Sequence, residues 1–470
     1  MNIPLGDTNF VKYVDSTGEK DLDYLVLGTT TIWEKVIEFT ATTTYSPISK
    51  VVNYAISGAR VGEFTKWSYQ VKSINEFEDA IDEAFKVAND KKKGSVHIDI
   101  PKCISAEYYR KKCRLDSSDT YNFSINNYIL DKEKAYKCAT LINNAKKPIM
   151  YLGQGAIESS QFIREIAIRG SIPVTTTIHG TGIFDERHPL SLRWCGMHGL
   201  AAANYSLQEA DLIIALGSRF DDRTTGNLKE YAPKAFEAGA RGEGGIIHVN
   251  TEPKEIQKVV KSHYNFPVSS YTFMKYIRHH IKKTERKEWI DYVTTLKHKY
   301  PFKYKSSQDK LHMEDVLTEL YGHTLDKQVI FTTGVGNHQM QAYQFIKSQY
   351  PKKIISSGSL GVMGAGLPYS IGTQIANPNK LVINIDGDSS FNMTATDMKT
   401  IVENNLPIKI AIMNNDAQMM VTIWEKLFYN SRYTATLNTR NPDYVKLAES
   451  FGIPSFSCSS KEHLSGSIDA

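Results

Sequence analysis

The sequence predicts an α/β protein built from doubly wound domains, in which helices cover both faces of a parallel β-sheet. Short apolar runs of strand length alternate with helical segments along most of the chain. Gly-rich turns follow several of these runs, at the strand ends where such sheets bind ligands. The length of 470 residues exceeds what one core normally organises, so we expect three domains, the first of them incomplete.

The composition indicates a folded chain without nucleic-acid or membrane partners. Hydrophobic residues at 41% and charged residues at 23% match globular proteins. The net charge of +5 is dispersed, and basic patches such as Lys91-Lys92-Lys93 suit solvated helix ends better than a nucleic-acid surface. No apolar run reaches the ~20 residues that span a bilayer. Five cysteines without CxxC spacing predict neither a disulfide framework nor a zinc site.

The first domain is expected within residues 1–125. Residues up to about 55 show no clear period and receive no assignment. Ser73-Ile74-Asn75-Glu76 is a capping box that predicts a helix with apolar residues at helical spacing from Phe77 to Ala88. The run from Ser95 to Pro101 predicts a strand. The polar segment 114–127 has the composition of a linker.

Two α/β domains are expected after this linker, at residues 126–295 and 296–470. The second domain opens with a helix near residues 132–144, and a Lys-rich passage at 282–305 separates it from the third domain, whose last strand we expect to be missing. The predicted strands of the two domains are Pro148 to Leu152, Ile172 to Thr176, Asp211 to Leu216, Gly245 to Val249, Gln328 to Thr332, Leu381 to Ile385, and Ile408 to Met413.

The most specific motif lies at two strand ends of the third domain. The strand that ends at Ile385 runs into Asp386-Gly387-Asp388-Ser389-Ser390, and the strand that ends at Met413 runs into Asn414-Asn415. Carboxylate and amide oxygens at neighbouring strand ends suit Mg²⁺, which can bridge to a diphosphate. Gly387 lets the backbone approach phosphates closely. Taken singly, each half is also ordinary turn chemistry.

This pair resembles the signature of thiamine-diphosphate enzymes, in which GD(G/A/S) precedes NN by about two dozen residues. The resemblance implies that Mg²⁺ is held by Asp388, Asn415 and the main-chain carbonyl of Ala417. The resemblance also implies that the parallel-sheet domains have the doubly wound fold of thiamine-diphosphate enzymes.

Further blocks resemble acetolactate synthase, particularly its fungal form, from about Thr65 to about residue 460. Arg219-Phe220-Asp221-Asp222-Arg223 belongs to the FAD site in that family, and other thiamine enzymes such as pyruvate decarboxylase lack it. The remaining blocks are Thr65-Lys66-Trp67, Pro173 to Thr177, Gly196 to Gly199, Gly217-Ser218, Thr224 to Asn227, Thr333 to Met340, Gly361 to Gly364 and Met420 to Trp424.

The resemblance also implies the site residues. Met363 would hold thiamine in its bent form, Met420 and Trp424 would line the substrate pocket from one helical face, and Lys72 would attract an anionic keto acid. The diphosphate would be bound by Asn337, His338, Gln339, Gly361, Gly387, Ser389 and Ser390. FAD would be bound by Gly153, Gly155, Met197, His198, Gly217, Arg219, Asp221 and Arg223.

Each of these residues has a structural reading as well. Gly153-Gln154-Gly155 lacks the third glycine of the dinucleotide fingerprint. His198 could be a hydrogen-bonded structural histidine, and Arg219 with Arg223 a surface ion-pair cluster. Met363, Met420 and Trp424 could be core residues, and Lys72 a solvated surface lysine.

The implied reaction joins a two-carbon unit from pyruvate to pyruvate or 2-oxobutyrate, on the pathways to valine, leucine and isoleucine. Its cofactors would be thiamine diphosphate, Mg²⁺ and FAD, with FAD in a structural role. The family further implies a homodimer or homotetramer, a regulatory subunit and a mitochondrial location, although the first residues carry no recognisable transit pattern.

The sequence also departs from the family. The catalytic glutamate has no counterpart that we find, residues 1–55 do not align, and Met419 replaces a glycine beside the substrate helix. A catalytically silent paralogue acting as a structural subunit therefore stays open. An NAD-dependent oxidoreductase built on the Gly153 turn is a third reading, which leaves the pair of metal motifs unexplained.

Overall fold

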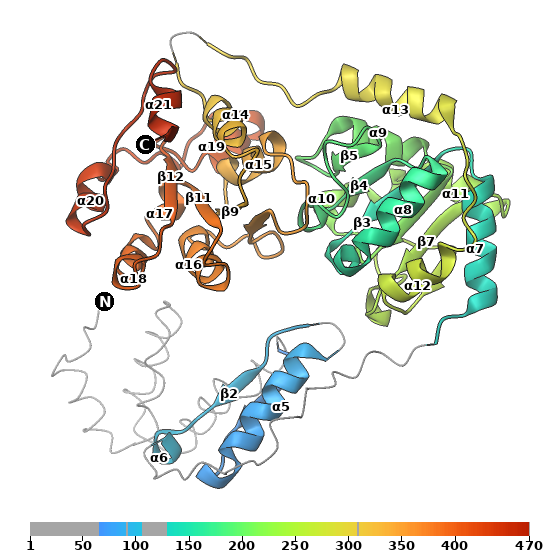
Figure 1. Cartoon of the computed structure of the whole chain (residues 1–470), viewed down its shortest axis with the longest axis horizontal. Coiled ribbons are helices and arrows are strands. Elements are labelled where there is room, and N and C mark those ends of the chain that lie inside the picture. The colour runs from blue at the N-terminus through green and yellow to red at the C-terminus, as the bar shows by residue number, and fades with distance from the viewer. Residues whose placement is uncertain (1–64, 91–92, 106–128, 308–309, 470) are drawn as a thin grey trace. The chain divides into compact units, whose positions relative to one another are not determined.

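The computed structural model describes residues 65–90, 93–105, 129–307 and 310–469 (Figure 1). The chain divides into two compact units, residues 1–127 and 128–470, which we describe separately. The predictions for residues 1–55 and for the linker at 114–127 lie outside the described residues. No helix among the described residues is long and apolar enough to cross a membrane.

The first unit contains two short parallel strands and a helix. β1 (Ser68–Gln70) pairs with β2 (His97–Asp99), and α5 (Phe77–Asn89) packs beside them after the 3-10 turn η4 (Ile74–Glu76). A short helix, α6 (Lys102–Ser105), follows β2. The predicted capping box is wrong, because the Ser73 side chain makes no capping hydrogen bond. The Glu76 carboxylate instead accepts a hydrogen bond from the backbone N–H of Lys72.

The second unit begins with a six-stranded parallel sheet of order β5-β4-β3-β6-β7-β8. Chain order runs outward in both directions from the β3–β6 pair, so this pair is the switch point of the sheet. The strands are β3 (Pro148–Leu152), β4 (Val174–Thr176), β5 (Ser191–Trp194), β6 (Leu212–Leu216), β7 (Gly245–Val249) and β8 (Tyr264–Phe266).

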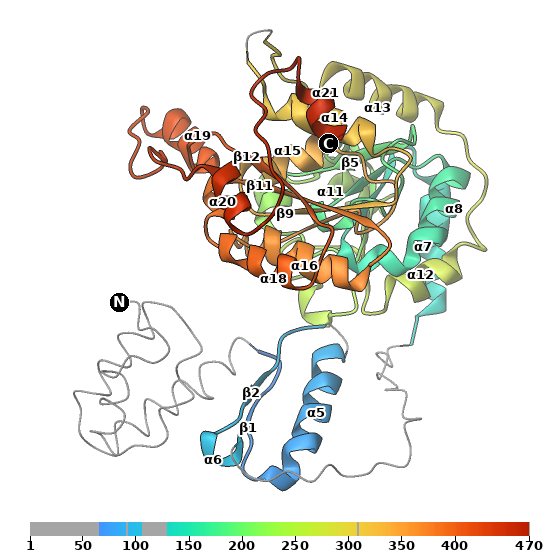
Figure 2. The same ribbon diagram turned by 60° about the vertical axis from the view of Figure 1, so that its left-hand side comes forward.

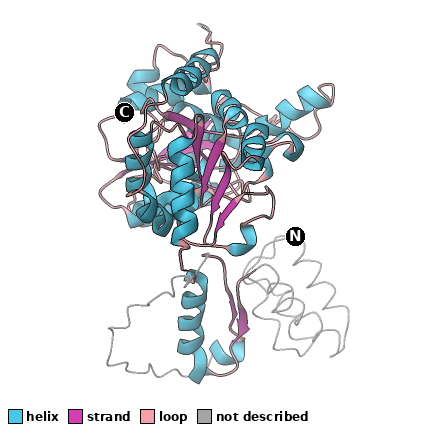
Figure 3. Ribbon diagram, turned by 90° about the vertical axis from the view of Figure 1, so that its right-hand side faces the viewer, coloured by secondary structure: helices cyan, strands magenta, loops and turns pink. Residues whose placement is uncertain are grey.

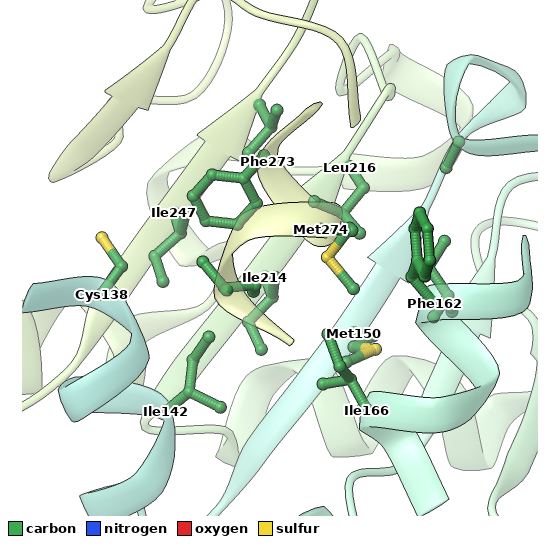
Figure 4. Packing of buried hydrophobic residues seen from close by; sticks show 14 of the residues in the cluster. Cys138, Ile142, Met150, Phe162, Ile166, Ile214, Leu216, Ile247, Phe273 and Met274 are labelled. Atoms are coloured by element: carbon green, nitrogen blue, oxygen red, sulfur yellow. The ribbon is translucent and has the colours of Figure 1, made fainter. Parts of the chain in front are cut away.

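Helices cover both faces of this sheet, as the buried apolar strands predict (Figure 3). Alternate strand residues face opposite layers: Met150 packs against one layer and Ile149 against the other. Figure 4 shows the first layer, where α7 (Lys132–Asn144), α8 (Ser160–Gly170) and α12 (Ser270–Ile277) meet the sheet. The opposite layer consists of α9 (Ala201–Glu209), α11 (Pro233–Ala240) and α13 (Lys287–Lys299).

The short elements of this half lie in its loops. They are the 3-10 turns η5 (Gln154–Ser159), η6 (Ile178–Gly180), η7 (Leu228–Glu230) and η8 (Pro253–Glu255), and the helix α10 (Asp222–Thr225).

The prediction that residues 282–305 only separate two domains is corrected by helix α13, which lies within this passage. Its Trp289, Val293 and Leu296 are buried in the same core as Ile149. The Lys-rich composition hid this face, because the lysines of the passage lie at the two ends of the helix and outside it, whereas the buried residues lie between them.

A four-stranded parallel sheet of order β10-β9-β11-β12 forms the rest of the unit. Its switch point is the β9–β11 pair. The strands are β9 (Val329–Thr333), β10 (Ile354–Ser356), β11 (Leu381–Gly387) and β12 (Lys409–Met413). The flanking elements are α14 (Met313–His323), α15 (Asn337–Phe345), α16 (Gly366–Ala376), α17 (Asp388–Phe391), η9 (Ala395–Asp397), α18 (Met398–Glu403), α19 (Met419–Phe428), α20 (Tyr444–Ser450) and α21 (Leu464–Asp469).

The α/β fold class is confirmed by these two parallel sheets. Every strand predicted from residue 148 onward forms within two residues of its expected limits. The prediction missed β5, β8 and β10, which are short strands at the edges of their sheets. In Figure 2, α19 stands out from the four-stranded half, and none of its residues is buried.

Candidate functional site

The carboxyl ends of β9 and β11 form the centre of the candidate site. The turn after β9 leads through Gly334 and Gly336 into α15, and β11 leads directly into α17. A sheet of this kind binds ligands in the crevice outside the strand ends at its switch point. The Asp386 to Ser390 motif and the Asn337 to Gln339 segment lie at this switch point, and Asn414-Asn415 follows the neighbouring strand β12.

His338, in the first turn of α15, is buried beside a carboxylate. Its Nε2 lies 3.3 Å from Oδ1 of Asp386, which is wholly buried. The other oxygen of Asp386 has no hydrogen-bond partner among the described residues. A Cβ added to Gly387 would lie 2.6 Å from His338 Nδ1, so any larger residue would displace the buried His338 ring. Gln339, also buried, donates from Nε2 to the Ser357 carbonyl at 3.1 Å.

Asp388, the first residue of α17, is held by two asparagines from a distant segment. Asn438 Nδ2 donates to its Oδ2 at 2.9 Å, and Asn441 Nδ2 donates to the same oxygen at 2.7 Å. The sequence analysis missed both asparagines. They lie 50 and 53 residues after Asp388, in a polar stretch before Pro442 that has ordinary turn composition.

The end of β12 lies beside the end of β11. Gly387 is in register with Met413, so Asp388 and Asn414 occupy equivalent positions just past the paired residues. Asn441 Nδ2 also donates to Asn414 Oδ1 at 2.9 Å. The Oδ1 of Asn415 accepts a hydrogen bond from the Ala417 N–H at 3.2 Å.

The residues present fit a divalent cation. Asp388 is buried, yet no described lysine, arginine or histidine forms an ion pair with it. A buried carboxylate without a cationic partner is costly, and a bound cation removes that cost. In the described ranges, no three His, Cys, Asp or Glu side chains cluster as a metal site. The predicted ligand set contains one carboxylate, one amide and one main-chain carbonyl, so it differs from such a cluster of His, Cys, Asp and Glu side chains.

The loop from residue 357 to 364 carries Gly361 and Met363 and borders the same strand ends. Gly361 and Gly364 have φ of 65° and 78°, which favours glycine at both positions. The Gly364 N–H donates to Ser390 Oγ at 2.9 Å, so the loop is tied to α17. Met363 is half-buried.

Helix α19 presents Met420 and Trp424 one turn apart, as their spacing predicted. Trp424 packs on Phe428, with ring centroids 4.9 Å apart. Met419 is the first residue of the helix and has no positive φ, so its backbone does not require glycine.

The predicted FAD residues gather at the switch point of the six-stranded sheet. Gly153 follows β3 and Gly217 follows β6, and the two turns touch. A Cβ on Gly153 would lie 2.2 Å from the Gly217 carbonyl oxygen, and one on Gly155 would lie 3.0 Å from the Gly217 Cα. The two turns thus approach at distances that only glycines allow.

The other predicted FAD residues line the neighbouring loops. The exposed Met197 donates its N–H to the Arg223 carbonyl at 2.8 Å. Burial, and then the charge of Arg223, lower the pKa of His198. Asp221 is the N-cap residue of α10, and its carbonyl accepts hydrogen bonds from the N–H groups of Thr224 and Thr225, both at 3.0 Å, and from their hydroxyls.

The two halves of the unit meet next to both switch points. Arg219 Nη2 donates to Ser359 Oγ at 3.2 Å, which links the predicted FAD residues to the 357–364 loop. Gln344 Nε2 donates to the His198 carbonyl at 2.9 Å. A Cβ on Gly358 would lie 2.4 Å from His179 Nε2. Lys72 is an exposed residue of the first unit, so it is described apart from these groups.

Comparison with known proteins gives matches over both halves of this unit. The family model "Thiamine pyrophosphate enzyme, central domain" matches residues 136–275, and "Thiamine pyrophosphate enzyme, C-terminal TPP binding domain" matches residues 334–470. The chain is 41% identical over 419 residues to the mitochondrial acetolactate synthase catalytic subunit of Saccharomyces cerevisiae. That match covers 86% of the chain and 61% of the relative.

Two further relatives show the same pattern. The mitochondrial acetolactate synthase of Schizosaccharomyces pombe is 39% identical over 85% of the chain and 62% of its own length. The acetolactate synthase large subunit of Cyanidium caldarium is 36% identical over 86% of the chain and 69% of its own length. The chain thus spans about three fifths of the length of the two fungal relatives.

Proposed function

The chain belongs to the acetolactate synthase family of thiamine pyrophosphate enzymes, and we propose that it catalyses the decarboxylative condensation of pyruvate with a second 2-keto acid. The products are 2-acetolactate from pyruvate and 2-aceto-2-hydroxybutyrate from 2-oxobutyrate. These products lead to valine, leucine and isoleucine.

The arrangement of Asp388 carries this proposal. It is a buried carboxylate at a sheet switch point, held through one oxygen and without a cationic partner among the described side chains. Binding of a divalent cation together with a diphosphate would explain why this carboxylate is buried without a cationic partner, which an ordinary turn residue would not be. The proposed ligands are Asp388, the Asn415 amide and the carbonyl of Ala417.

Thiamine diphosphate, when bound, supplies the electron sink that decarboxylation of a 2-keto acid requires. Asn337, His338 and Gln339 offer the N-terminus of α15 to the diphosphate, where backbone N–H groups favour negative charge. Gly387, Ser389 and Ser390 offer the start of α17 beside it. Gly361 lets the loop turn so that Met363 can support the bent cofactor.

The substrate is proposed to lie against Met363, Met420 and Trp424. These side chains are apolar, and a keto acid bound against them would be shielded from water, which strengthens its electrostatic interactions. Lys72 is proposed to attract the carboxylate of the incoming substrate.

FAD is proposed to bind at the second switch point without a net redox role. The glycine contacts around Gly217 allow a pyrophosphate to approach the backbone closely. Arg219 and Arg223 supply forked donors to phosphate oxygens. The other proposed contacts are Gly153, Gly155, Met197, His198 and Asp221.

The direct test is an activity assay. The purified full chain is incubated with pyruvate, thiamine diphosphate, Mg²⁺ and FAD, and acetolactate is measured. We expect acetolactate in the complete mixture and none without thiamine diphosphate or Mg²⁺. An Asp388→Ala variant is expected to form none.

A second candidate function is a structural subunit that joins an active partner. One observation favours it. From Thr65 onward, the residues that resemble the family include no counterpart of its catalytic glutamate. A chain that binds FAD and thiamine diphosphate but forms no acetolactate supports this alternative.

We further propose a mitochondrial location, a homodimer or homotetramer, and association with a regulatory subunit. The names of the fungal relatives, a mitochondrial catalytic subunit and a mitochondrial synthase, support the location and the regulatory partner. Sedimentation of the purified chain tests the oligomer, and a monomer alone contradicts it.

A further inference from the structure

The hydrogen bonds around Asp388 divide its two oxygens into different roles. Asn438 and Asn441 both donate to Oδ2, whereas no hydrogen bond from a described residue reaches Oδ1. Two donors on one oxygen fix the plane of the carboxylate. Oδ1 therefore stays available to a ligand from outside the protein.

The side-chain amide of Asn441 has more hydrogen-bond acceptors around it than hydrogens to donate. Its Nδ2 lies 2.7 Å from Asp388 Oδ2, 2.9 Å from Asn414 Oδ1 and 2.9 Å from Asp416 Oδ1. An amide group has two hydrogens, so one of the three oxygens is always without a donor from this group. Three oxygens, from the end of β11 and from the residues after β12, thus lie around Asn441 Nδ2, which holds them close together.

The segment 436–441, which carries both asparagines, is fastened to the end of β12. The Gln418 N–H donates to the Thr436 carbonyl at 2.8 Å, and the Asn438 N–H donates to the Asp416 carbonyl at 2.7 Å. Asn438 Nδ2 also reaches Ser389 Oγ at 2.6 Å. The two backbone hydrogen bonds hold the segment in place independently of the asparagine side chains.

We propose that Asn438 and Asn441 are positioning residues that set the affinity of the strand-end site for a divalent cation. They orient Asp388 through Oδ2, keep Oδ1 available, and hold the oxygens of the β12 end close to it. Groups that orient a ligating carboxylate typically change metal affinity 10- to 100-fold when removed. This inference rests on the proposed function, because it concerns the same metal site.

The test measures cation binding rather than turnover. Free Mn²⁺ is followed by electron paramagnetic resonance as it is titrated into the full chain with thiamine diphosphate. We expect Asn441→Ala and Asn438→Ala each to raise the Mn²⁺ dissociation constant about tenfold. Asn404→Ala is the matched control, since Asn404 also donates through Nδ2, at 2.8 Å to the Thr400 carbonyl, but lies outside the site.

Asn441→Asp separates positioning from a purely structural role. It replaces a donor by a second carboxylate next to Asp388, so we expect a lower melting temperature without Mn²⁺ and recovery when Mn²⁺ is added. A merely structural role lowers the melting temperature equally with and without Mn²⁺. That result, or parental Mn²⁺ affinity in both alanine variants, overturns the inference.

The outcomes distinguish this inference from the proposed function. A parent chain that binds Mn²⁺ but forms no acetolactate refutes the catalytic function, and weaker Mn²⁺ binding by the variants still supports the positioning role. A parent chain that binds no Mn²⁺ overturns both.

Discussion

Gly217 shows how a single residue sets the geometry of a whole turn. Its φ is 59°, a conformation that residues with a side chain adopt only at a cost. A Cβ would also lie 2.4 Å from the carbonyl carbon of Gly155. Both constraints act at the switch point where FAD is proposed to bind.

We expect Gly217→Ala to lower the free energy of unfolding by about 3 kcal/mol, the sum of backbone strain and overpacking. Urea denaturation measures this loss. Gly242→Ala is the matched control, because Gly242 has φ of 72° but no atom within 4 Å of an added Cβ. The control should lose about 1 kcal/mol. Equal losses in the two variants contradict the steric argument.

At the scale of the elements, one arginine side chain caps the C-terminal ends of both α7 and α8. Arg286, the N-cap residue of α13, is buried, and its guanidinium donates to the carbonyls of Ile142, Asn143, Ala145 and Gly170. These carbonyls belong to the last turn of α7, its C-cap and the last residue of α8, which have no partners within their helices. Burial lowers the pKa of Arg286.

Arg286→Met keeps the volume of the side chain but leaves buried carbonyls without donors. We expect the free energy of unfolding to fall by about 3 kcal/mol. Amide hydrogen exchange should show faster opening of the last turns of α7 and α8. Arg241→Met serves as the control, since the exposed Arg241 forms an ion pair with the exposed Glu243, and its loss should stay below about 0.5 kcal/mol. A similar loss in both variants contradicts the capping role.

A buried ion pair of the six-stranded half, Arg193 with Glu186, makes hydrogen bonds to the backbone of the four-stranded half. Arg193, in β5, donates to the carbonyls of Tyr343 at 2.9 Å and Ile346 at 3.1 Å, at the C-terminal end of α15. Its Nη2 also lies 3.5 Å from Oε2 of Glu186, which is buried. The arginine of one half therefore caps a helix of the other.

Arg193→Met leaves the Glu186 carboxylate buried without its cation, at a cost of about 3–5 kcal/mol. Glu186→Gln combined with Arg193→Met should lose less, because no charge stays buried. Scanning calorimetry checks both variants, and we expect the single variant to show separate transitions for the two halves. A double variant less stable than the single one contradicts the charge argument.

The stability of the molecule should also fall in mild acid. Burial lowers the pKa of five described histidines, which are His179, His188, His198, His248 and His263. The unfolded chain, with histidine pKa near 6.5, then binds more protons than the folded chain. The free energy of unfolding should therefore decrease as pH falls through 6.5 towards the lowered values.

His248 tests this pH dependence. It is fully buried, with Nε2 3.1 Å from the Ser218 carbonyl, and this hydrogen bond and the charge of Glu255 only partly offset the lowering of its pKa by burial. Urea denaturation between pH 8 and pH 5 should show a shallower decline for His248→Gln than for the parent chain. An identical decline rules out a contribution from His248.

Local patterns were sufficient to predict the parallel sheets, and they also indicated the strand ends at which the site is proposed. Buried strands are continuous apolar runs, and the turns after them need glycine and short polar residues whatever lies around them. The edge strands β5, β8 and β10 escaped prediction because three or four residues carry too little pattern, whereas the longer edge strand β12 was predicted. The apolar face of α13 escaped because it is short and lysines flank it on both sides.

Long-range contacts had no such local signal. Nothing near Asn438 and Asn441 in the chain indicates Asp388, and nothing near Arg286 indicates the ends of α7 and α8. These contacts arise because parallel strands bring distant turns to one edge, where buried charges and carbonyls must find partners. Which polar group meets which is therefore a consequence of the packed fold rather than of neighbouring residues.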